Sequence, residues 1–160
     1  MYALKKAKEN NCLTILNPAP ARKIQKEDFS LLDFFTPNET EAEFYLNKKI
    51  ETKEDIQNAA KEFLSMGVKN IIITLGAKGV YFENKEENYF IDALSLKDEV
   101  IDTTGAGDAF NGALAVALAK DSNYKDAIIF ANKVGGISTT RLGAASSMPV
   151  SYTHLRAHET

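Results

Sequence analysis

The chain alternates between segments with helical periodicity and short apolar runs typical of strands. Residues 52–66 form the clearest amphipathic helix, because their apolar side chains recur three and four positions apart. On one face this helix places Ile56, Ala59, Ala60, Phe63 and Leu64. Thr52 is the expected N-cap, with Asp55 as its partner three residues later, and Gly67 is the expected stop.

The same criteria predict the remaining elements. Further helices are expected over residues 2–10, 39–46, 108–119 and 124–139. Strands are expected over residues 12–16, 33–36 and 69–75, as a hairpin over 80–84 and 88–93, and as a strand or extended segment ending near 100–102. The run KNIIITL at 69–75 is apolar on both faces, as in a covered parallel strand. This alternation predicts an α/β fold with a largely parallel sheet flanked by helices.

Composition narrows the function classes. The 160 residues are 44% hydrophobic and 26% charged, a balance typical of soluble globular proteins. The net charge of −3 gives no electrostatic case for nucleic acid or an anionic membrane as a partner. No apolar run approaches the roughly 20 residues of a membrane span, and the N-terminus lacks the apolar block of a signal peptide. Cys12 is the only cysteine and is expected to be a small buried hydrophobic residue in a reducing, cytoplasmic setting.

The segment DTTGAGDAF at residues 102–110 is the strongest candidate for a catalytic, phosphate-binding site. Two glycines precede a predicted helix, whose first turn offers free amides and a partial positive charge to a phosphate. Asp108 would lie beside those amides and could accept a proton from a hydroxyl that attacks phosphorus. An acid in a first turn can also merely complement the helix dipole, which stabilises by about 0.3–1 kcal/mol. The pattern alone leaves both interpretations open.

Two familiar nucleotide-binding patterns are absent from the sequence. After Gly105 and Gly107 the next glycine is Gly112, too late for the dinucleotide pattern G-x-G-x-x-G. No G-x-x-x-x-G-K-[ST] phosphate loop occurs anywhere in the chain.

DTTGAGDAFNGAL closely resembles the C-terminal signature of the ribokinase-like (PfkB) carbohydrate kinases. Four further segments match this family in the same order: LNPAPAR (16–22), TPNETEAE (36–43), ITLGAKGV (73–80) and FAN…TRLGAASSMP (130–149). The resemblance covers residues 1–149 and implies a Rossmann-like ribokinase fold. It implies that the chain is the C-terminal, ATP-binding part of such a domain, without the N-terminal half and the β-sheet lid.

The resemblance also implies roles for individual residues. Asp108 would be the catalytic base that contacts the sugar hydroxyl, beside an anion hole made by Gly105, Ala106 and Gly107. Asn38 would contact nucleotide, and Glu41 would help organise Mg²⁺ and phosphate. From pattern alone, the preferred interpretation of these two is an N-cap and a first-turn acid. The expected ATP-site residues are Asn38, Glu41, Thr74, Leu75, Gly76, Ala77, Lys78, Gly79, Gly107, Asp108 and Asn132. A monovalent cation, K⁺, would be held by Asp102, Thr104, Ser138, Arg141, Gly143 and Ser147.

The resemblance implies ATP-dependent phosphorylation of a sugar hydroxyl. NPAPA and NETEAE resemble the family members that act on D-ribose, so D-ribose is the expected sugar. The full-length protein is expected to be a homodimer that binds no nucleic acid or membrane. The alternatives are another sugar or nucleoside kinase of this family and a truncated fragment that binds nucleotide without catalysis. Residues 150–160 do not match the family and are expected to be foreign or disordered; His154 and His158 have a metal-binding spacing that is expected to be coincidental.

Overall fold

The computed structural model describes residues 2–95 and 99–149 of the chain. Within the chain two compact units are distinguished, Met1–Ile91 and Asp92–Thr160. The assignment of residues 1–149 to one domain stays a prediction. The tail at 150–160, with its His154 and His158 pair, lies outside the described residues.

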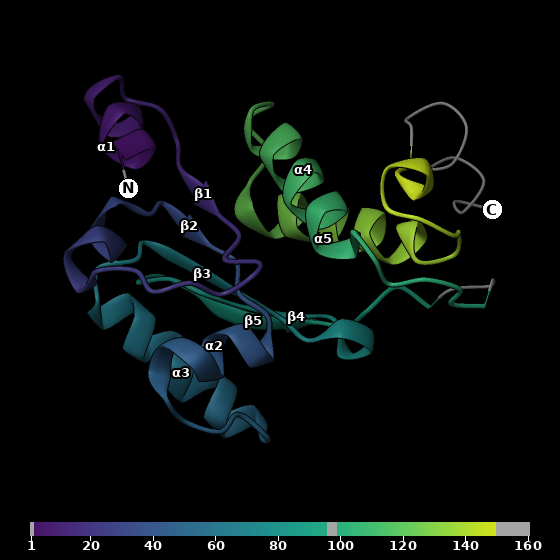
Figure 1. The fold of residues 1–160 in the computed structure, drawn as a ribbon, viewed down its shortest axis with the longest axis horizontal. Helices are drawn as coiled ribbons and strands as arrows, with labels where there is room; N and C mark the ends of the chain where they lie inside the picture. Colours follow the sequence, from purple (N-terminus) through teal and green to yellow (C-terminus); the bar gives the residue numbers. More distant parts are fainter. Residues whose placement is uncertain (1, 96–98, 150–160) are drawn as a thin grey trace. The chain divides into compact units, whose positions relative to one another are not determined.

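The first unit contains a five-stranded sheet in the order β1-β2-β3-β4-β5 (Figure 1). Its strands are β1 (Ile15–Leu16), β2 (Phe34–Phe35), β3 (Asn70–Thr74), β4 (Val80–Glu83) and β5 (Asn88–Ile91). The first three strands are parallel, with Phe35 opposite Ile71, and β3, β4 and β5 pair antiparallel. The α/β class and the hairpin are therefore confirmed, and the sheet is mixed.

Helices α2 (Glu39–Leu46) and α3 (Lys53–Ser65) lie on the same side of this sheet (Figure 1). Helix α3 packs on β3 and β4, and α2 packs on β3 and α3. The predicted cap of α3 is confirmed, because Thr52 Oγ1 accepts the Asp55 amide at 3.1 Å and Asp55 Oδ2 accepts the Thr52 amide at 2.8 Å. Gly67 follows the helix with φ +107°, a conformation that glycine adopts without strain.

An aromatic cluster fills the space between this face of the sheet and its helices. Phe35 of β2 lies 5.1 Å from Phe63 of α3 and 5.5 Å from both Phe29 and Tyr45, measured between ring centroids. Phe35 and Phe63 are fully buried. The cluster joins sheet and helices through edge-on ring contacts, which stabilise beyond the burial of their area.

Asp33, which precedes β2, forms a second cluster that is polar. Its carboxylate accepts hydrogen bonds from the Thr14 amide at 2.9 Å and the Thr14 hydroxyl at 3.0 Å. It also forms ion pairs with Lys8 and, at 2.9 Å, with Lys69. Burial alone would raise the pKa of Asp33, but the bonds from Lys8, Lys69 and Thr14 outweigh it and lower the pKa to about 2.

Asp33 is expected to make the stability of the chain depend on acidity. Because its pKa is about 2 in the folded chain and 3.8 in the unfolded one, its stabilisation is complete above the unfolded value and is lost as pH falls toward 2. This contribution is about 2 kcal/mol near neutral pH. Urea unfolding should therefore give Asp33→Asn a lower free energy of unfolding than wild type. This difference should shrink as the pH falls from about 5 to about 2. The exposed Glu86→Gln change in the β4–β5 turn serves as control, and a deficit for Asp33→Asn that stays constant with pH would contradict the assignment.

The first unit also differs from the sequence predictions. A 3₁₀ helix, η1 (Lys26–Leu31), was not predicted, whereas α1 (Tyr2–Glu9) was. The expectation that Cys12 is buried is wrong, since Cys12 is exposed. Its amide donates to the Ala7 carbonyl at 2.9 Å, so Cys12 belongs to the turn that ends α1 and precedes the half-buried strand β1.

The second unit is built on α4 (Ala106–Leu118) and α5 (Tyr124–Ser138), which pack against each other. A β-carbon at Gly135 of α5 would lie 3.2 Å from the Ala106 carbonyl oxygen, so the helices approach closely at the start of α4. No strand forms near 100–102 in the described chain. There the amides of Ile101 and Asp102 donate to the Thr139 carbonyl just beyond α5, at 2.8 and 3.1 Å, instead of to a neighbouring strand.

Candidate functional site

The start of α4 contains the predicted phosphate-binding turn. Gly105 is its N-cap, with φ +79°, and offers no side-chain cap. The Ala106 amide donates to Thr103 at 3.2 Å and the Ala109 amide to Gly105 at 2.9 Å. Among the described residues this leaves the amides of Gly107 and Asp108 without a carbonyl partner.

Asp108 lies in the first turn of α4 with an exposed side chain. Unpaired amides and a carboxylate are therefore brought together on one helix end, as the sequence predicted. Such an end attracts an anion through its amides and dipole, and the adjacent carboxylate can accept a proton. The arrangement is suited to phosphoryl transfer to a hydroxyl.

The conformation of the turn requires glycine at position 105. A β-carbon there would lie 3.1 Å from the Ala144 β-carbon and 3.2 Å from its Cα. The positive φ of this residue is also a backbone conformation that residues other than glycine rarely adopt. The turn is thereby packed directly against the loop that follows α5. A sequence pattern can suggest this glycine but cannot show its contact with Ala144.

Asp102 is bonded to two other predicted cation-site residues, Thr104 and Gly143. Its Oδ1 accepts the Thr104 amide at 2.9 Å, and its Oδ2 accepts the Gly143 amide at 2.9 Å. Bonds from the Thr104 side chain and from the amides of Thr104 and Gly143 lower the pKa of Asp102 below its usual value. The carboxylate is therefore charged at neutral pH.

The other predicted cation-site residues lie along the same C-terminal segment. Ser138 ends α5 and donates its hydroxyl to Gly135 at 2.7 Å, and Ser147, in η3 (Ala145–Ser147), donates to Ala144 at 2.8 Å. Both serines are buried, and Arg141 is exposed between them. Both hydroxyls donate their protons to carbonyls of their own segment, so their oxygen lone pairs are not used in these bonds.

In the first unit, Asn38 and Glu41 form the N-terminal cap of α2. Asn38 Oδ1 accepts the Glu41 amide at 2.8 Å, and Glu41 Oε2 accepts the Asn38 amide at 2.9 Å. The structural interpretation of these two residues is thus confirmed, and their role toward nucleotide stays a prediction. The cap lies beside the end of β3, because Asn38 forms a bridge with Thr74 and the Thr74 amide donates to Pro37 at 2.9 Å.

The predicted ATP-site loop follows β3. The Leu75 amide donates to the Gly79 carbonyl at 2.8 Å, which closes a short turn over η2 (Gly76–Lys78). Its tip at 76–78 is exposed, and Lys78 reaches Glu39 in the first turn of α2 at 3.5 Å. The unit therefore brings Asn38, Glu41 and the loop together at one end of β3.

Asn132, the remaining predicted nucleotide residue, lies in the middle of α5. Its amide nitrogen donates to the Asp92 carbonyl at 2.8 Å. This bond ties the helix to the chain that enters the second unit, and it accounts for a polar residue at this position without a ligand.

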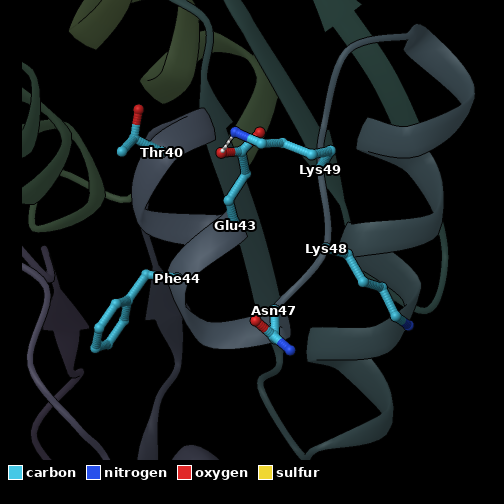
Figure 2. A pocket seen from close by; sticks show the side chains of 6 residues that line it. All are labelled: Thr40, Glu43, Phe44, Asn47, Lys48 and Lys49. Carbon is cyan, nitrogen blue, oxygen red and sulfur yellow. Dashed lines mark hydrogen bonds and ion pairs between the residues drawn. The ribbon is translucent and has the colours of Figure 1, made fainter.

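A surface hollow of about 370 Å³ lies elsewhere, on the outer side of α2 and the chain after it (Figure 2). Glu43 and Lys49 form an ion pair of 3.0 Å across it. Bonds from the Ile50 amide and from Lys49 lower the pKa of Glu43. The hollow is lined by Thr40, Glu43, Phe44, Asn47, Lys48 and Lys49. None of the predicted site residues lines it.

Comparison with known proteins identifies the family. Residues 1–151 match the pfkB family of carbohydrate kinases. The chain is 42% identical to a ribokinase of Staphylococcus aureus over 145 residues, which are 90% of this chain and 47% of the relative. It is 41% identical to a ribokinase of Haemophilus influenzae, over 89% of this chain and 46% of the relative. The chain thus spans about half the length of these relatives.

Solved structures agree with this result. A ribokinase from Thermotoga maritima is similar with a TM-score of 0.82 and 43% identity, over 92% of this chain and 49% of that one. A ribokinase from Arabidopsis thaliana, complexed with ribose and ATP, is similar with a TM-score of 0.85 and 30% identity, over 91% and 47%. Over the described residues, no helix is long and apolar enough to cross a membrane. The chain belongs to the pfkB family of carbohydrate kinases.

Proposed function

We propose that the chain is the ATP-binding half of a ribokinase, which converts ATP and D-ribose to ADP and ribose 5-phosphate. The observation that carries this proposal is the start of α4, where an exposed Asp108 adjoins the amides of Gly107 and Asp108, which have no carbonyl partner within residues 2–95 and 99–149. Support for ribose comes from the relatives named ribokinase and from the related structure that contains ribose and ATP.

In the proposed reaction Asp108 accepts the proton of the attacking sugar hydroxyl. The sugar oxygen then bonds to the γ-phosphorus of ATP while the bond from that phosphorus to the bridging oxygen breaks, and ADP leaves with the electron pair. The amides of the turn stabilise the negative charge on the transferring group, which is where catalysis of phosphoryl transfer chiefly arises. Gly105 and Ala106 shape the turn that holds these amides.

The nucleotide would be bound by Asn38, Glu41, the loop from Thr74 to Gly79, and Asn132. Mg²⁺ would neutralise phosphate charge, and Glu41 fits an indirect role toward it. Mg²⁺ prefers phosphate, carboxylate and water oxygens, so most of its ligands in this proposal come from the nucleotide and water.

A monovalent cation, K⁺, fits the segment between Asp102 and Ser147. The charged Asp102 carboxylate supplies a hard oxygen donor, and Thr104 and Gly143 lie beside it through their hydrogen bonds. The remaining oxygens would come from the chain around Ser138, Arg141 and Ser147. We further propose that the complete enzyme is a homodimer in the cytoplasm.

The test of the function compares sugars with the complete enzyme. ADP formation is measured with D-ribose, 2-deoxy-D-ribose and D-fructose, and D-ribose is expected to give the highest kcat/KM. A deoxyribokinase of Salmonella typhi is 33% identical to this chain, so a preference for 2-deoxy-D-ribose is the specific alternative. Such a preference would overturn the choice of ribose while leaving the kinase chemistry in place.

The 160-residue chain by itself is expected to bind nucleotide without turnover. Calorimetric titration with ATP and Mg²⁺ should show binding, and the same sample should form no ribose 5-phosphate. Turnover by this chain would contradict the proposal that it supplies only the ATP-binding half.

A further inference from the structure

The Asp102 side chain links two stretches of the second unit that are far apart in sequence. Oδ1 accepts the Thr104 amide at 2.9 Å within the turn before α4. Oδ2 accepts the Gly143 amide at 2.9 Å, 41 positions later, in the loop after α5. One carboxylate thus bonds to the backbone on both sides of the contact.

The same two stretches meet through contacts that do not involve this side chain. The amides of Ile101 and Asp102 donate to the Thr139 carbonyl at 2.8 and 3.1 Å. Gly105 packs so closely on Ala144 that a β-carbon would lie 3.1 Å from the β-carbon of Ala144. The turn before α4 therefore rests on the loop after α5, and Asp102 is its side-chain link.

We infer that Asp102 is a positioning residue, which holds the phosphoryl-binding turn in place through the Gly143 amide without requiring a bound cation. The catalytic part of this inference rests on the proposed function. Transition-state stabilisation requires donors held close to their ideal positions, and a shift of about 1 Å can cost roughly 10²-fold in rate. The bond to Gly143 restrains the chain three residues before the first anion-hole residue.

A carboxylate suits this role because both of its partners are donors. Each of its oxygens accepts one amide. Asparagine at this position would offer one acceptor oxygen, and its amino group would face a second donor. Asp102→Asn keeps the shape of the side chain and removes one of the two bonds.

Amide hydrogen exchange tests this link in the 160-residue chain. Wild type, Asp102→Asn and Asp102→Ala are compared in a buffer whose cation is tetramethylammonium. Because a hydrogen bond to a charged group is worth about 1.5–3 kcal/mol, the Gly143 amide should exchange about 10–100-fold faster in Asp102→Ala. Leu114, buried in the middle of α4, should exchange unchanged and reports that the unit remains folded. Asp126→Ala, which removes a first-turn acid of α5, is the matched control and should leave Gly143 unchanged.

Two outcomes would overturn the inference. One is equal exchange at Gly143 in wild type and Asp102→Ala. The other is protection of Gly143 in wild type that arises only after KCl is added, since a cation and not the hydrogen bond would then hold the loop. If Asp102→Ala also exposes Leu114, the comparison rests on Asp102→Asn, whose single acceptor oxygen can keep only one of the two bonds. Faster exchange at either the Thr104 or the Gly143 amide then supports the two-sided link, and unchanged exchange at both amides counts against it.

Kinetics of the complete enzyme separate this inference from the proposed function. Asp102→Asn is expected to lower kcat while leaving KM for sugar and ATP unchanged, because the turn acts on the transferring group. A rise in KM with kcat unchanged would contradict a positioning role. Failure of wild type to phosphorylate ribose would overturn the proposed function and leave the exchange result standing.

Discussion

Turnover of the complete kinase is expected to fall by about 10²–10⁴-fold when Asp108 is replaced by asparagine. Asparagine has nearly the same shape, so the helix and its unpaired amides remain, but it cannot accept a proton from the sugar hydroxyl. Binding of sugar and ATP should change little, because the loss concerns the transition state and not the ground state. The measurement is the steady-state rate of ADP formation at saturating ribose and ATP.

Asp126→Asn provides the matched control for this experiment. Asp126 also lies in the first turn of a helix of the second unit, and its amide donates to the capping Oδ1 of Asn123 at 2.9 Å. If a first-turn acid matters only through the helix dipole, Asp108→Asn and Asp126→Asn should both lose little turnover, and by similar amounts. Near wild-type turnover for Asp108→Asn would remove Asp108 from the mechanism.

The largest expected effect on stability is that of Phe35→Ala. Phe35 is fully buried in β2 and touches the rings of Phe29, Tyr45 and Phe63. Truncation removes these contacts and leaves a cavity, which costs about 3–5 kcal/mol. That is a large share of the roughly 5–15 kcal/mol that stabilises a typical domain.

Phe44→Ala is the matched control, because Phe44 is the same residue type with 55% of its surface exposed. Its ring centroid lies 5.3 Å from that of Tyr45, so the free energy of unfolding is expected to fall by at most about 1 kcal/mol. Urea unfolding should show a lower midpoint for Phe35→Ala with an unchanged slope. Equal losses in the two variants would show that the aromatic cluster does not dominate the stability of the first unit.

Local signals made most of the fold predictable. The cap at Thr52 and Asp55, the apolar face of α3 and the stop at Gly67 depend on residues within a few positions of one another, and all of them are confirmed. The hairpin of β4 and β5 is similarly local. The helix start at Gly105–Asp108 was also visible, because two glycines and an acid stand directly before an apolar run.

Features that depend on tertiary contacts could not be predicted in this way. The segment near 100–102 is as apolar as a strand, but its amides bond to Thr139 beyond α5. The link from Asp102 to Gly143 spans 41 positions and leaves no local signature. Cys12 stands next to an apolar run and is exposed, because the turn that ends α1 extends to its amide.

The cap on α2 fixes the chemical polarity that Asn38 presents to solvent. One lone pair of its carbonyl oxygen already accepts the Glu41 amide at 2.8 Å, whereas its amino group is a donor that the cap does not use. A molecule that bonds to this amino group must offer lone pairs and not protons, as phosphate oxygens do. The bond that begins the helix thereby fixes the orientation of the amide, and with it the place of the donor that is left for a ligand.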